Sequence, residues 1–380
     1  MVIIWGYNGY NTLGLIHCMA ENECEFLLLL VSRSKRNFVL LSKYSKNHHV
    51  VTTEDEAINY LINNKEALNG STIIPTADTI VCKLADNNNL LASFYHYPHT
   101  VEPSLIIKLQ NKNEQLKLAK AAGFNILKTF EYKKGDILPV DVQYPCIIKQ
   151  LNSTVGYKEK ILPCNNLQEL KQCLLSAVNT DRFIIQKYIK KDLELLLIGC
   201  RTNNGKIYIP AYFQKERWIM NGGDASKGII ISGEKPLCVS IEAVHVFLNK
   251  INYVGPFSIE FGLENGIPYF FEINLRNDGT SHYFHESGVY VPYVYYKSEI
   301  DKGFVMPDHE NIRYTFIDEL GDINNVFNKV ISFITWYRDL KEARAYKYFC
   351  RYDLKPFLAI FMMNIGGRLK KIILKRRWLK

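Results

Sequence analysis

The fold is decided by two segments of the sequence, Gly255-Pro-Phe-Ser-Ile-Glu260-Phe261 and Tyr269-Phe-Phe-Glu272-Ile273-Asn274-Leu275-Arg276. Each alternates apolar and polar residues, as a half-buried strand does. Between them lies Glu264-Asn265-Gly266, and Asn-Gly is a strong signal for a tight turn. The sequence therefore predicts a β-hairpin with strands at 255–261 and 267–273.

The hairpin gathers polar side chains on one face. Residues two apart on a strand point the same way, so Glu272, Asn274 and Arg276 share a face, and the aliphatic residues between them point into a core. Pairing around the turn brings Glu260 close to Glu272. Two carboxylates and an amide oxygen suit Mg²⁺, which takes few protein ligands and leaves the rest to substrate phosphates. An edge hairpin with a solvated polar side also explains the alternation, but not the choice of two acids, an Asn and an Arg.

Two lysines precede the hairpin. Lys112 opens a predicted helix, and Lys149 ends the apolar strand 144–149. A lysine buried at such a strand end needs an anion, and phosphate is a natural partner. Singly, either lysine is more often a surface residue with a buried stem. A further strand ends in Gln186-Lys187-Tyr188-Ile189, where free backbone groups suit the edge of a purine.

Taken in order, these motifs resemble the ATP-grasp superfamily in its carboxylate–amine ligase branch. The chain is similar in motif order to biotin carboxylase, carbamoyl-phosphate synthase and the D-alanine or D-aspartate ligases. The resemblance covers about residues 72–295. It rests on Lys112, Pro145-Cys-Ile-Ile-Lys149, Ile185-Gln-Lys-Tyr-Ile189, Glu260 and Glu272-Ile-Asn-Leu-Arg276.

The resemblance implies a role for each matched nucleotide-binding position. Lys112 and Lys149 match the lysines on the ATP phosphates, and Lys149 also acts in catalysis. Gln186 matches the residue facing the adenine amino group. Lys187 and Ile189 match residues whose backbone contacts the adenine edge.

The resemblance also implies a metal and catalytic set. Glu194 matches an acid that contacts the ribose. Glu260, Glu272 and Asn274 match the ligands of Mg²⁺, with two ions expected and Mn²⁺ as a substitute. Arg276 matches the catalytic arginine that steadies the acyl-phosphate and the tetrahedral intermediate.

One loop departs from the family pattern. The phosphate loop is usually glycine-rich, whereas residues 152–158 contain a single glycine. Ser153 and Thr154 are expected to bind phosphate through their hydroxyl and backbone N–H groups. The shortage of glycine bears on the mobility of the loop more than on ATP binding.

The fold class expected is α/β. Predicted strands at 2–5, 26–31 and 72–75 alternate with helices at 13–20 and 54–68, which indicates a parallel, doubly wound sheet. The turn after the first strand lacks the G-x-G-x-x-G fingerprint, because Asn8 stands where the second glycine would be. We therefore expect a Rossmann-like domain without a dinucleotide. The expected division is a pre-ATP-grasp domain at 1–108, an ATP-grasp domain at 109–305 with a lid lobe at about 124–188, and a C-terminal helical extension at 306–380.

Composition restricts the class of protein. The chain has 380 residues, 47% hydrophobic, with no apolar run long enough to span a membrane, and we expect no signal peptide. Its nine cysteines form no CxxC pair, which favours buried thiols in a reducing cytoplasm. Net charge is +9, but seven Lys and Arg and no acid lie in residues 366–380. The positive charge is therefore local, and we expect no nucleic-acid partner.

The C-terminal tail has two open interpretations. Residues 356–365 are apolar except for Asn364, and the basic end follows. This composition suits an interfacial anchor on anionic lipid. It equally suits a helix docked on the core with a solvated end.

Substrate contacts are less well marked. Residues 221–234 are expected to form a long polar loop, and long ordered loops are often functional. Lys215 and Arg217 precede this loop and could meet an acidic or sugar-bearing substrate. His282 follows the hairpin, and we expect it at a substrate wall or in a structural role, since no third metal ligand accompanies it and His285.

The function expected is that of an ATP-grasp ligase, which activates a carboxylate as acyl-phosphate and joins it to an amine. A cell-surface polysaccharide or peptidoglycan precursor would suit a membrane-facing tail. Alternatives are a carbamoyl-phosphate synthase or carboxylase-like enzyme using bicarbonate, and a non-catalytic ATP-binding adaptor. The expected partners are small-molecule substrates, an anionic membrane surface and, in a homodimer, a second copy. The expected location is the cytoplasm or the inner face of the cell membrane.

Overall fold

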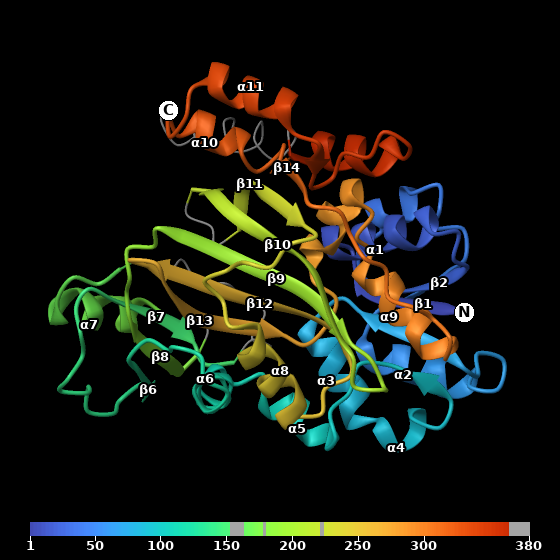
Figure 1. Ribbon diagram of the computed structural model, residues 1–380, viewed down its shortest axis with the longest axis horizontal. Coiled ribbons are helices and arrows are strands. Elements are labelled where there is room, and N and C mark those ends of the chain that lie inside the picture. Colours follow the sequence, from blue (N-terminus) through green and yellow to red (C-terminus); the bar gives the residue numbers. More distant parts are fainter. Residues whose placement is uncertain (153–162, 178–179, 221–223, 365–380) are drawn as a thin grey trace, which may run out of the picture.

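The computed structural model describes residues 1–152, 163–177, 180–220 and 224–364 (Figure 1). The predicted sites Ser153 and Thr154 and the basic segment 366–380 lie outside these residues. Within the described part of the chain, no helix is long and apolar enough to cross a membrane.

The N-terminal part is a five-stranded parallel sheet, in the order β3-β2-β1-β4-β5, which confirms the doubly wound prediction. Buried side chains alternate between two hydrophobic cores, with Ile3 and Trp5 in one and Val2 and Ile4 in the other, as expected when helices cover both faces. Its elements are β1 (Val2–Tyr7), α1 (Tyr10–Glu21), β2 (Phe26–Val31), η1 (Phe38–Leu41), β3 (His48–Val51), α2 (Glu54–Asn63), β4 (Ser71–Pro75), α3 (Asp78–Asp86), α4 (Asn88–Leu91) and β5 (Tyr95–His96).

A seven-stranded sheet forms the centre of the molecule, in the order β13-β12-β9-β10-β11-β14-β15. Alternate residues of β9 enter two different cores: Leu195 and Leu197 pack with α6 and α8, and Leu196 and Ile198 with α1 and α9. The sheet therefore has two covered faces. The elements are α5 (Pro103–Lys108), α6 (Lys112–Ala121), β9 (Leu193–Arg201), β10 (Ile207–Trp218), β11 (Ala225–Ser232), α8 (Ile241–Lys250), β12 (Gly255–Glu264), β13 (Ile267–Asn274), η2 (Gly279–Ser287) and α9 (Val291–Ile300).

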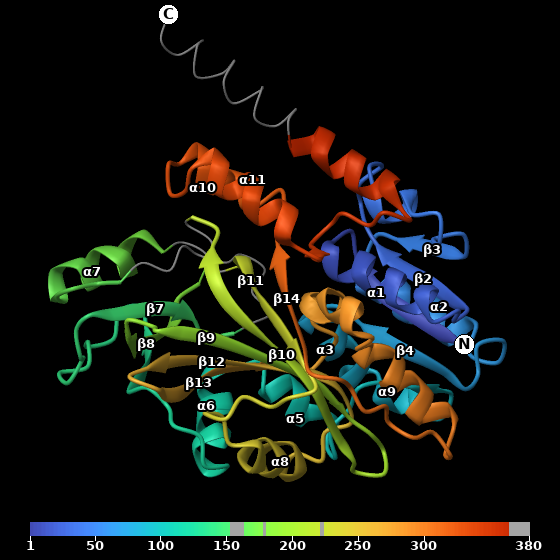
Figure 2. The same ribbon diagram turned by 45° about the horizontal axis from the view of Figure 1, so that its top comes forward.

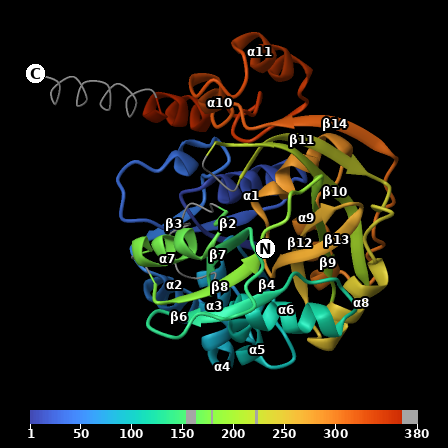
Figure 3. The ribbon, with the colours of Figure 1, turned by 90° about the vertical axis from the view of Figure 1, so that its left-hand side faces the viewer.

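A small three-stranded sheet, ordered β6-β8-β7, occupies the region expected to form a lid. It consists of β6 (Thr129–Lys133), β7 (Cys146–Gln150) and β8 (Arg182–Lys187), with α7 (Leu167–Ser176) packed on it. It has its own core, which includes Cys146, Cys164 and Phe183. Figures 1 and 3 show it beside the β12–β13 end of the central sheet.

One expectation about an element was wrong. Residues 225–232 of the predicted polar loop form β11, because Ile229, Ile230 and Ile231 supply the apolar content of a strand held between β10 and β14. The predicted helical extension at the C-terminal end is confirmed, and this region has strands as well. It contributes β14 (Ile312–Ile317) and β15 (Ala345–Tyr346) to the central sheet, alongside α10 (Ile323–Phe327), α11 (Phe333–Glu342) and helical residues 354–364.

Candidate active site

The β12–β13 hairpin places two acids directly opposite each other. Glu260 pairs with Glu272, which confirms that the turn brings them together. The register then shifts, so that Phe261 faces Phe270 and Phe271 is the extra residue of a β-bulge. Phe270 lies in the core, as do Ile273 and Leu275. Because of the bulge, Phe270, Ile273 and Leu275 all point into the core. Phe271 and Glu272 point to the site face.

A buried lysine joins two acids on the same face. The Lys215 ammonium donates to Glu194 Oε1 (2.5 Å) and Glu260 Oε2 (3.0 Å), and Lys191 also donates to Glu194. Burial acts to lower the pKa of Lys215, but Glu260 and Glu194 raise it well above its usual range. Burial raises the pKa of the Glu260 carboxyl, as do the neighbouring Glu272 and Glu194, against the pull of Lys215. An acidic cluster with one central cation results.

Lys112 faces the second acid of the hairpin. Asn111 caps α6 by accepting hydrogen bonds from two backbone N–H groups, and Lys112 is the first helical residue. The Lys112 backbone N–H donates to Leu151 O (2.9 Å), and its ammonium lies 3.1 Å from Glu272 Oε2. The helix start therefore fixes a cation against the acidic wall.

Lys149 reaches the site from the small sheet. Its ammonium donates to Gln186 Oε1 (3.2 Å) and lies 5.1 Å from the centre of the Phe271 ring. Gln186 is buried, and its amide donates to Thr129 Oγ1 (2.9 Å). Burial lowers the pKa of Lys149 to about 8, with a further contribution from Lys112 and an opposing one from the acids.

The segment predicted to face adenine lies at the end of β8, with Gln186 and Lys187 in the strand and Ile189 just after it. The Lys187 ammonium lies 3.6 Å from Glu264, and Ile189 is buried. Two backbone N–H groups are already bonded, Lys187 N to Lys128 O and Tyr188 N to Pro145 O.

Arg276 is held at the other end of the polar face. Its Nε lies 2.9 Å from Asp78 Oδ1, and its guanidinium also donates to Asn274 Oδ1 (3.1 Å). Asp278 lies 3.8 Å away. Burial acts to lower the pKa of Arg276, but Asp78 and Asp278 raise it, so the guanidinium stays cationic. Asp78, the first residue of α3, thus orients Arg276, the predicted catalytic arginine.

The donor set suits magnesium. Glu260, Glu272 and Asn274 offer two carboxylates and an amide oxygen at neighbouring register positions, and these hard oxygens are what Mg²⁺ prefers. Among the described residues, no group of three or more His, Cys, Asp and Glu is placed to hold a metal by itself. The fit therefore depends on oxygens from Asn274 and a substrate in addition to the two acids.

Three predicted substrate residues lie in different surroundings. Lys215 is inside the acidic cluster. Arg217 is engaged elsewhere, donating to Asp322 (2.6 Å) and Asp339 (2.9 Å) of the C-terminal region. His282 is buried between α1 and the His285 ring, 4.5 Å from the latter, and burial lowers its pKa well below the usual range. A substrate-wall or structural role for His282 stays a prediction.

Sequence reasoning missed Asp78, Lys191 and Phe271. Asp78 lies 198 residues from Arg276, and the one available signal was its place just after a parallel strand, where ligands gather. Lys191 stands three residues before Glu194. Residues three apart share a face on a helix but not on a strand, and this segment is not a helix, so the spacing gave no signal. Phe271 reaches this face through a bulge that alternation does not reveal.

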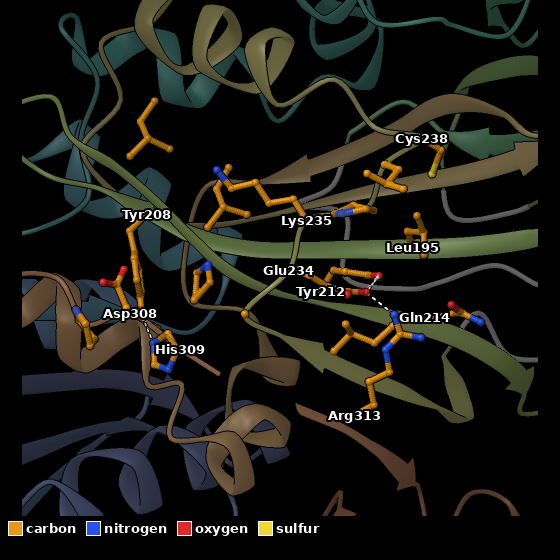
Figure 4. A pocket seen from close by; sticks show the side chains of 18 of the residues that line it. Leu195, Tyr208, Tyr212, Gln214, Glu234, Lys235, Cys238, Asp308, His309 and Arg313 are labelled. Atoms are coloured by element: carbon orange, nitrogen blue, oxygen red, sulfur yellow. Dashed lines mark hydrogen bonds and ion pairs between the residues drawn. The ribbon is translucent and has the colours of Figure 1, made fainter. Parts of the chain in front are cut away.

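A hollow of about 1180 Å³ lies on the opposite face of the central sheet (Figure 4). It is lined by Leu195 and Tyr212, which alternate with the site residues Glu194 and Lys215 along β9 and β10. Glu234 there accepts hydrogen bonds from Tyr212 and Arg313. The hollow is therefore separate from the acidic cluster.

No protein-family model matches the chain. Among curated proteins, the carbamoyl phosphate synthase large chain of Sulfolobus acidocaldarius is 30% identical over 95 residues, 24% of this chain and 9% of that protein. The N5-carboxyaminoimidazole ribonucleotide synthase of Aquifex aeolicus is 26% identical over 188 residues, 47% of this chain and 48% of that protein. The aligned region thus spans less than half the length of either relative.

Solved structures are similar over most of the chain. N5-carboxyaminoimidazole synthetase from Staphylococcus aureus, complexed with ADP, has a TM-score of 0.65 and 20% identity and covers 86% of each chain. The biotin carboxylase domain of Hydrogenobacter thermophilus 2-oxoglutarate carboxylase, in complex with MgADP, ADP and bicarbonate, has a TM-score of 0.62 and 14% identity, covering 82% of this chain and 73% of that one. From these likenesses and the sheet order described above, the chain has the ATP-grasp fold.

Proposed function

We propose that this chain is an ATP-dependent carboxylate–amine ligase. The observation that supports it most is the Glu260–Glu272 pair, with Lys112 on Glu272 and Arg276 four residues further along the chain. This arrangement combines oxygens for a metal with cations for a triphosphate on one face of a sheet. The structural neighbours described with bound ADP have the same fold.

The proposed reaction has two steps. A carboxylate oxygen of the substrate attacks the γ-phosphorus, and the bond from that phosphorus to ADP breaks. The amine nitrogen then attacks the acyl carbon, phosphate leaves, and the amine loses a proton to solvent. Atoms and charge balance with ADP and phosphate as the other products.

The chain's own residues orient and neutralise the reactants. Lys112 and Lys149 contact the triphosphate, exchanging their present partners Glu272 and Gln186 for phosphate oxygens. Gln186 and the backbone near Lys187 and Ile189 hold adenine, and Glu194 the ribose. Arg276, oriented by Asp78, donates to the oxyanion that develops at the acyl carbon.

Glu260, Glu272 and Asn274 would hold Mg²⁺, with Mn²⁺ as a substitute. The ion would supply positive charge that neutralises the triphosphate. Ser153 and Thr154 remain proposed phosphate ligands, and Lys215 a proposed substrate contact. The three-stranded sheet is proposed as the lid that excludes water from the acyl-phosphate.

We propose a cytoplasmic location and a cell-surface polysaccharide or peptidoglycan precursor as the substrate class. What supports this class is the basic C-terminal segment, which suits work near a membrane.

A second candidate is a carboxylase-like enzyme that phosphorylates bicarbonate. Its support is the similarity to proteins named as carbamoyl phosphate synthase and N5-carboxyaminoimidazole ribonucleotide synthase. Bicarbonate is also a carboxylate that γ-phosphate can activate, so the two candidates share the same site.

One experiment separates the candidates. Purified protein is incubated with MgATP and pools of amino acids, sugar acids and nucleotide sugars, with and without ¹³C-bicarbonate, while ADP and new masses are recorded. A ligase gives ADP and a condensed product without label, and a carboxylase gives a labelled product. Tight MgATP binding with no ADP from any pool would contradict both and favour an ATP-binding adaptor.

Two variants serve as controls for that experiment. Glu272→Gln and Arg276→Ala should each abolish product formation. Turnover at the wild-type rate in either variant would contradict the role assigned to that residue.

A further inference from the structure

Exposed apolar side chains concentrate in the C-terminal region. Of the 27 exposed large hydrophobic residues in the described chain, 12 lie within residues 327–363. They are Phe327, Val330, Phe333, Ile334, Tyr337, Phe349, Tyr352, Leu354, Leu358, Phe361, Met362 and Met363. A concentration of this kind marks an interaction site in a protein that is otherwise well packed.

These residues belong to elements that lie together. Helices α10 and α11 and the helical residues 354–364 form one layer at one end of the molecule, drawn orange-red to red in Figures 1 and 2. We call the exposed side chains of residues 327–364 the C-terminal face. The buried Asp339 of α11 pairs with Arg217 on β10, so the inner side of α11 contacts the central sheet.

Most of the exposed charged residues in this layer are basic. Within described residues 327–364, six basic residues are exposed and the one exposed acid is Glu342. The exposed basic residues are Lys329, Arg338, Lys341, Arg344, Arg351 and Lys355. Two acids of the same stretch point inward: Asp339 receives Arg217, and Asp353 lies 3.0 Å from His17. The outer surface is therefore apolar and basic.

The sequence extends this character. Residues 366–380, beyond the described part, add seven Lys and Arg and no acid. Aromatic, Met and Leu side chains among basic residues are the composition of protein surfaces that lie in the interface of an anionic bilayer. A second copy is a poor match, because two such faces would repel each other. A nucleic acid would leave most of the apolar side chains uncovered.

We propose that the C-terminal face binds peripherally to a bilayer containing anionic lipid. Its apolar side chains enter the headgroup region, and its lysines and arginines contact lipid phosphates. The proposal concerns binding alone and does not depend on the ligase reaction.

Vesicle binding tests the proposal on the full chain. Large unilamellar vesicles of phosphatidylcholine alone, or with one quarter phosphatidylglycerol, are sedimented with the protein at 0.1 and 0.5 M NaCl. We expect at least tenfold tighter binding to the anionic vesicles, weakened by salt. No binding to anionic vesicles, or equal binding to both compositions, overturns the proposal.

A matched pair of variants tests the apolar contribution. Ile334 on α11 and Leu175 on α7 are each 80% exposed, so an Asp at either position should leave folding intact. Ile334→Asp should weaken binding to anionic vesicles about tenfold, and Leu175→Asp should not change it. Equal binding by the two variants contradicts insertion of this face.

Hydrogen exchange gives a readout that needs no variant. Peptides from 327–363 should exchange more slowly when anionic vesicles are present. Slower exchange confined to 365–380 would show that the tail binds alone, and protection without vesicles at high protein concentration would indicate a second copy. Either result overturns the proposal.

Discussion

The Lys149 ammonium lies where burial and neighbouring charges oppose one another. Burial and Lys112 hold its pKa at about 8, below the usual 10.5, while Glu272, Glu194 and Glu260 act to raise it. Below pH 8 the group is a cation that can meet phosphate, and above pH 8 it is mostly neutral. Binding of ATP above that pH therefore requires uptake of a proton.

We accordingly expect the affinity for ATP to fall as pH rises through 8. The loss should approach about tenfold per pH unit well above the pKa. Lys149→Arg should show no such decline, because a guanidinium stays charged at these pH values. Calorimetric titration of ATP between pH 7 and 9.5 measures both. A wild-type affinity that is constant over this range would exclude Lys149 as a phosphate ligand.

Asp78 is expected to act through Arg276. Asp78→Asn keeps the shape but removes the charge that orients the guanidinium at 2.9 Å. We expect kcat to fall about tenfold to a hundredfold, since small misplacements of a catalytic group have effects of this size. ATP affinity should stay within about twofold. A parallel loss of ATP affinity in steady-state and binding measurements would place Asp78 in nucleotide binding instead.

At the residue scale, the sequence predicted the acids better than their partners. Alternation on one strand was enough to place Glu272 and Asn274 on one face, and the turn was enough to bring Glu260 opposite. The partner Lys215 comes from β10 and the partner Asp78 from the start of α3, and no local pattern encodes such contacts. Arg217 shows the same limit, because its carboxylates lie 105 and 122 residues away.

At the element scale, the bulge in β13 depends on a glycine across the strand pair. A Cβ at Gly262 would lie 2.0 Å from Phe271 Cζ. The Phe271 ring therefore occupies the space that the side chain of any larger residue at position 262 would need. The Phe271 ring in turn lies beneath the Lys149 and Lys191 ammonium groups. The hairpin therefore sets the position of cations that belong to other elements.

Gly262→Ala should lower the free energy of unfolding by about 1–3 kcal/mol, the usual cost of overpacking. Gly303→Ala is the matched control, because Gly303 is exposed, the nearest atom to the added Cβ lies at an ordinary contact distance of 3.4 Å, and the change should stay within about 0.5 kcal/mol. Urea unfolding measures both. If the clash is the cause, adding Phe271→Ala to Gly262→Ala should cost less than the two single changes together. Additive effects would contradict it.

Element prediction succeeded where hydrophobic patterns were continuous. The buried run at 26–31 gave β2 with its bounds, and the hairpin strands were close. It failed at β11, where Asp224, Ser226 and Lys227 suggested a polar loop, and the three isoleucines become buried only because β10 and β14 lie on each side. The strand β14 was not predicted, because its pairing with β11 joins segments about 85 residues apart.

At the scale of the whole molecule, Arg217 ties the C-terminal region to the central sheet. It is two residues from Lys215 on β10 and pairs with Asp322 and Asp339, both almost fully buried. Breaking a buried pair leaves uncompensated charge, which typically costs about 3–5 kcal/mol. These ion pairs therefore connect the layer that carries the C-terminal face to β10, the strand that carries Lys215.

We expect Arg217→Met to lower the free energy of unfolding by about 3–5 kcal/mol. The matched control is Arg313→Met, since Arg313 pairs with Glu234 but its side chain is 60% exposed. That change should cost less than about 1 kcal/mol. Chemical unfolding compares the two, and equal losses would mean that the Arg217 pairs are no stronger than a surface ion pair.

The central claim is that Glu260 and Glu272 bind the metal that accompanies ATP. The most direct measurement is calorimetric titration of ATP with Mg²⁺ and with EDTA, for the wild type, Glu272→Gln and the control Glu342→Gln on α11. Wild type and control should bind ATP at least tenfold more tightly with Mg²⁺, and Glu272→Gln should lose most of that gain. Unchanged Mg²⁺ dependence in Glu272→Gln, or no ATP binding by the wild type, would contradict the claim.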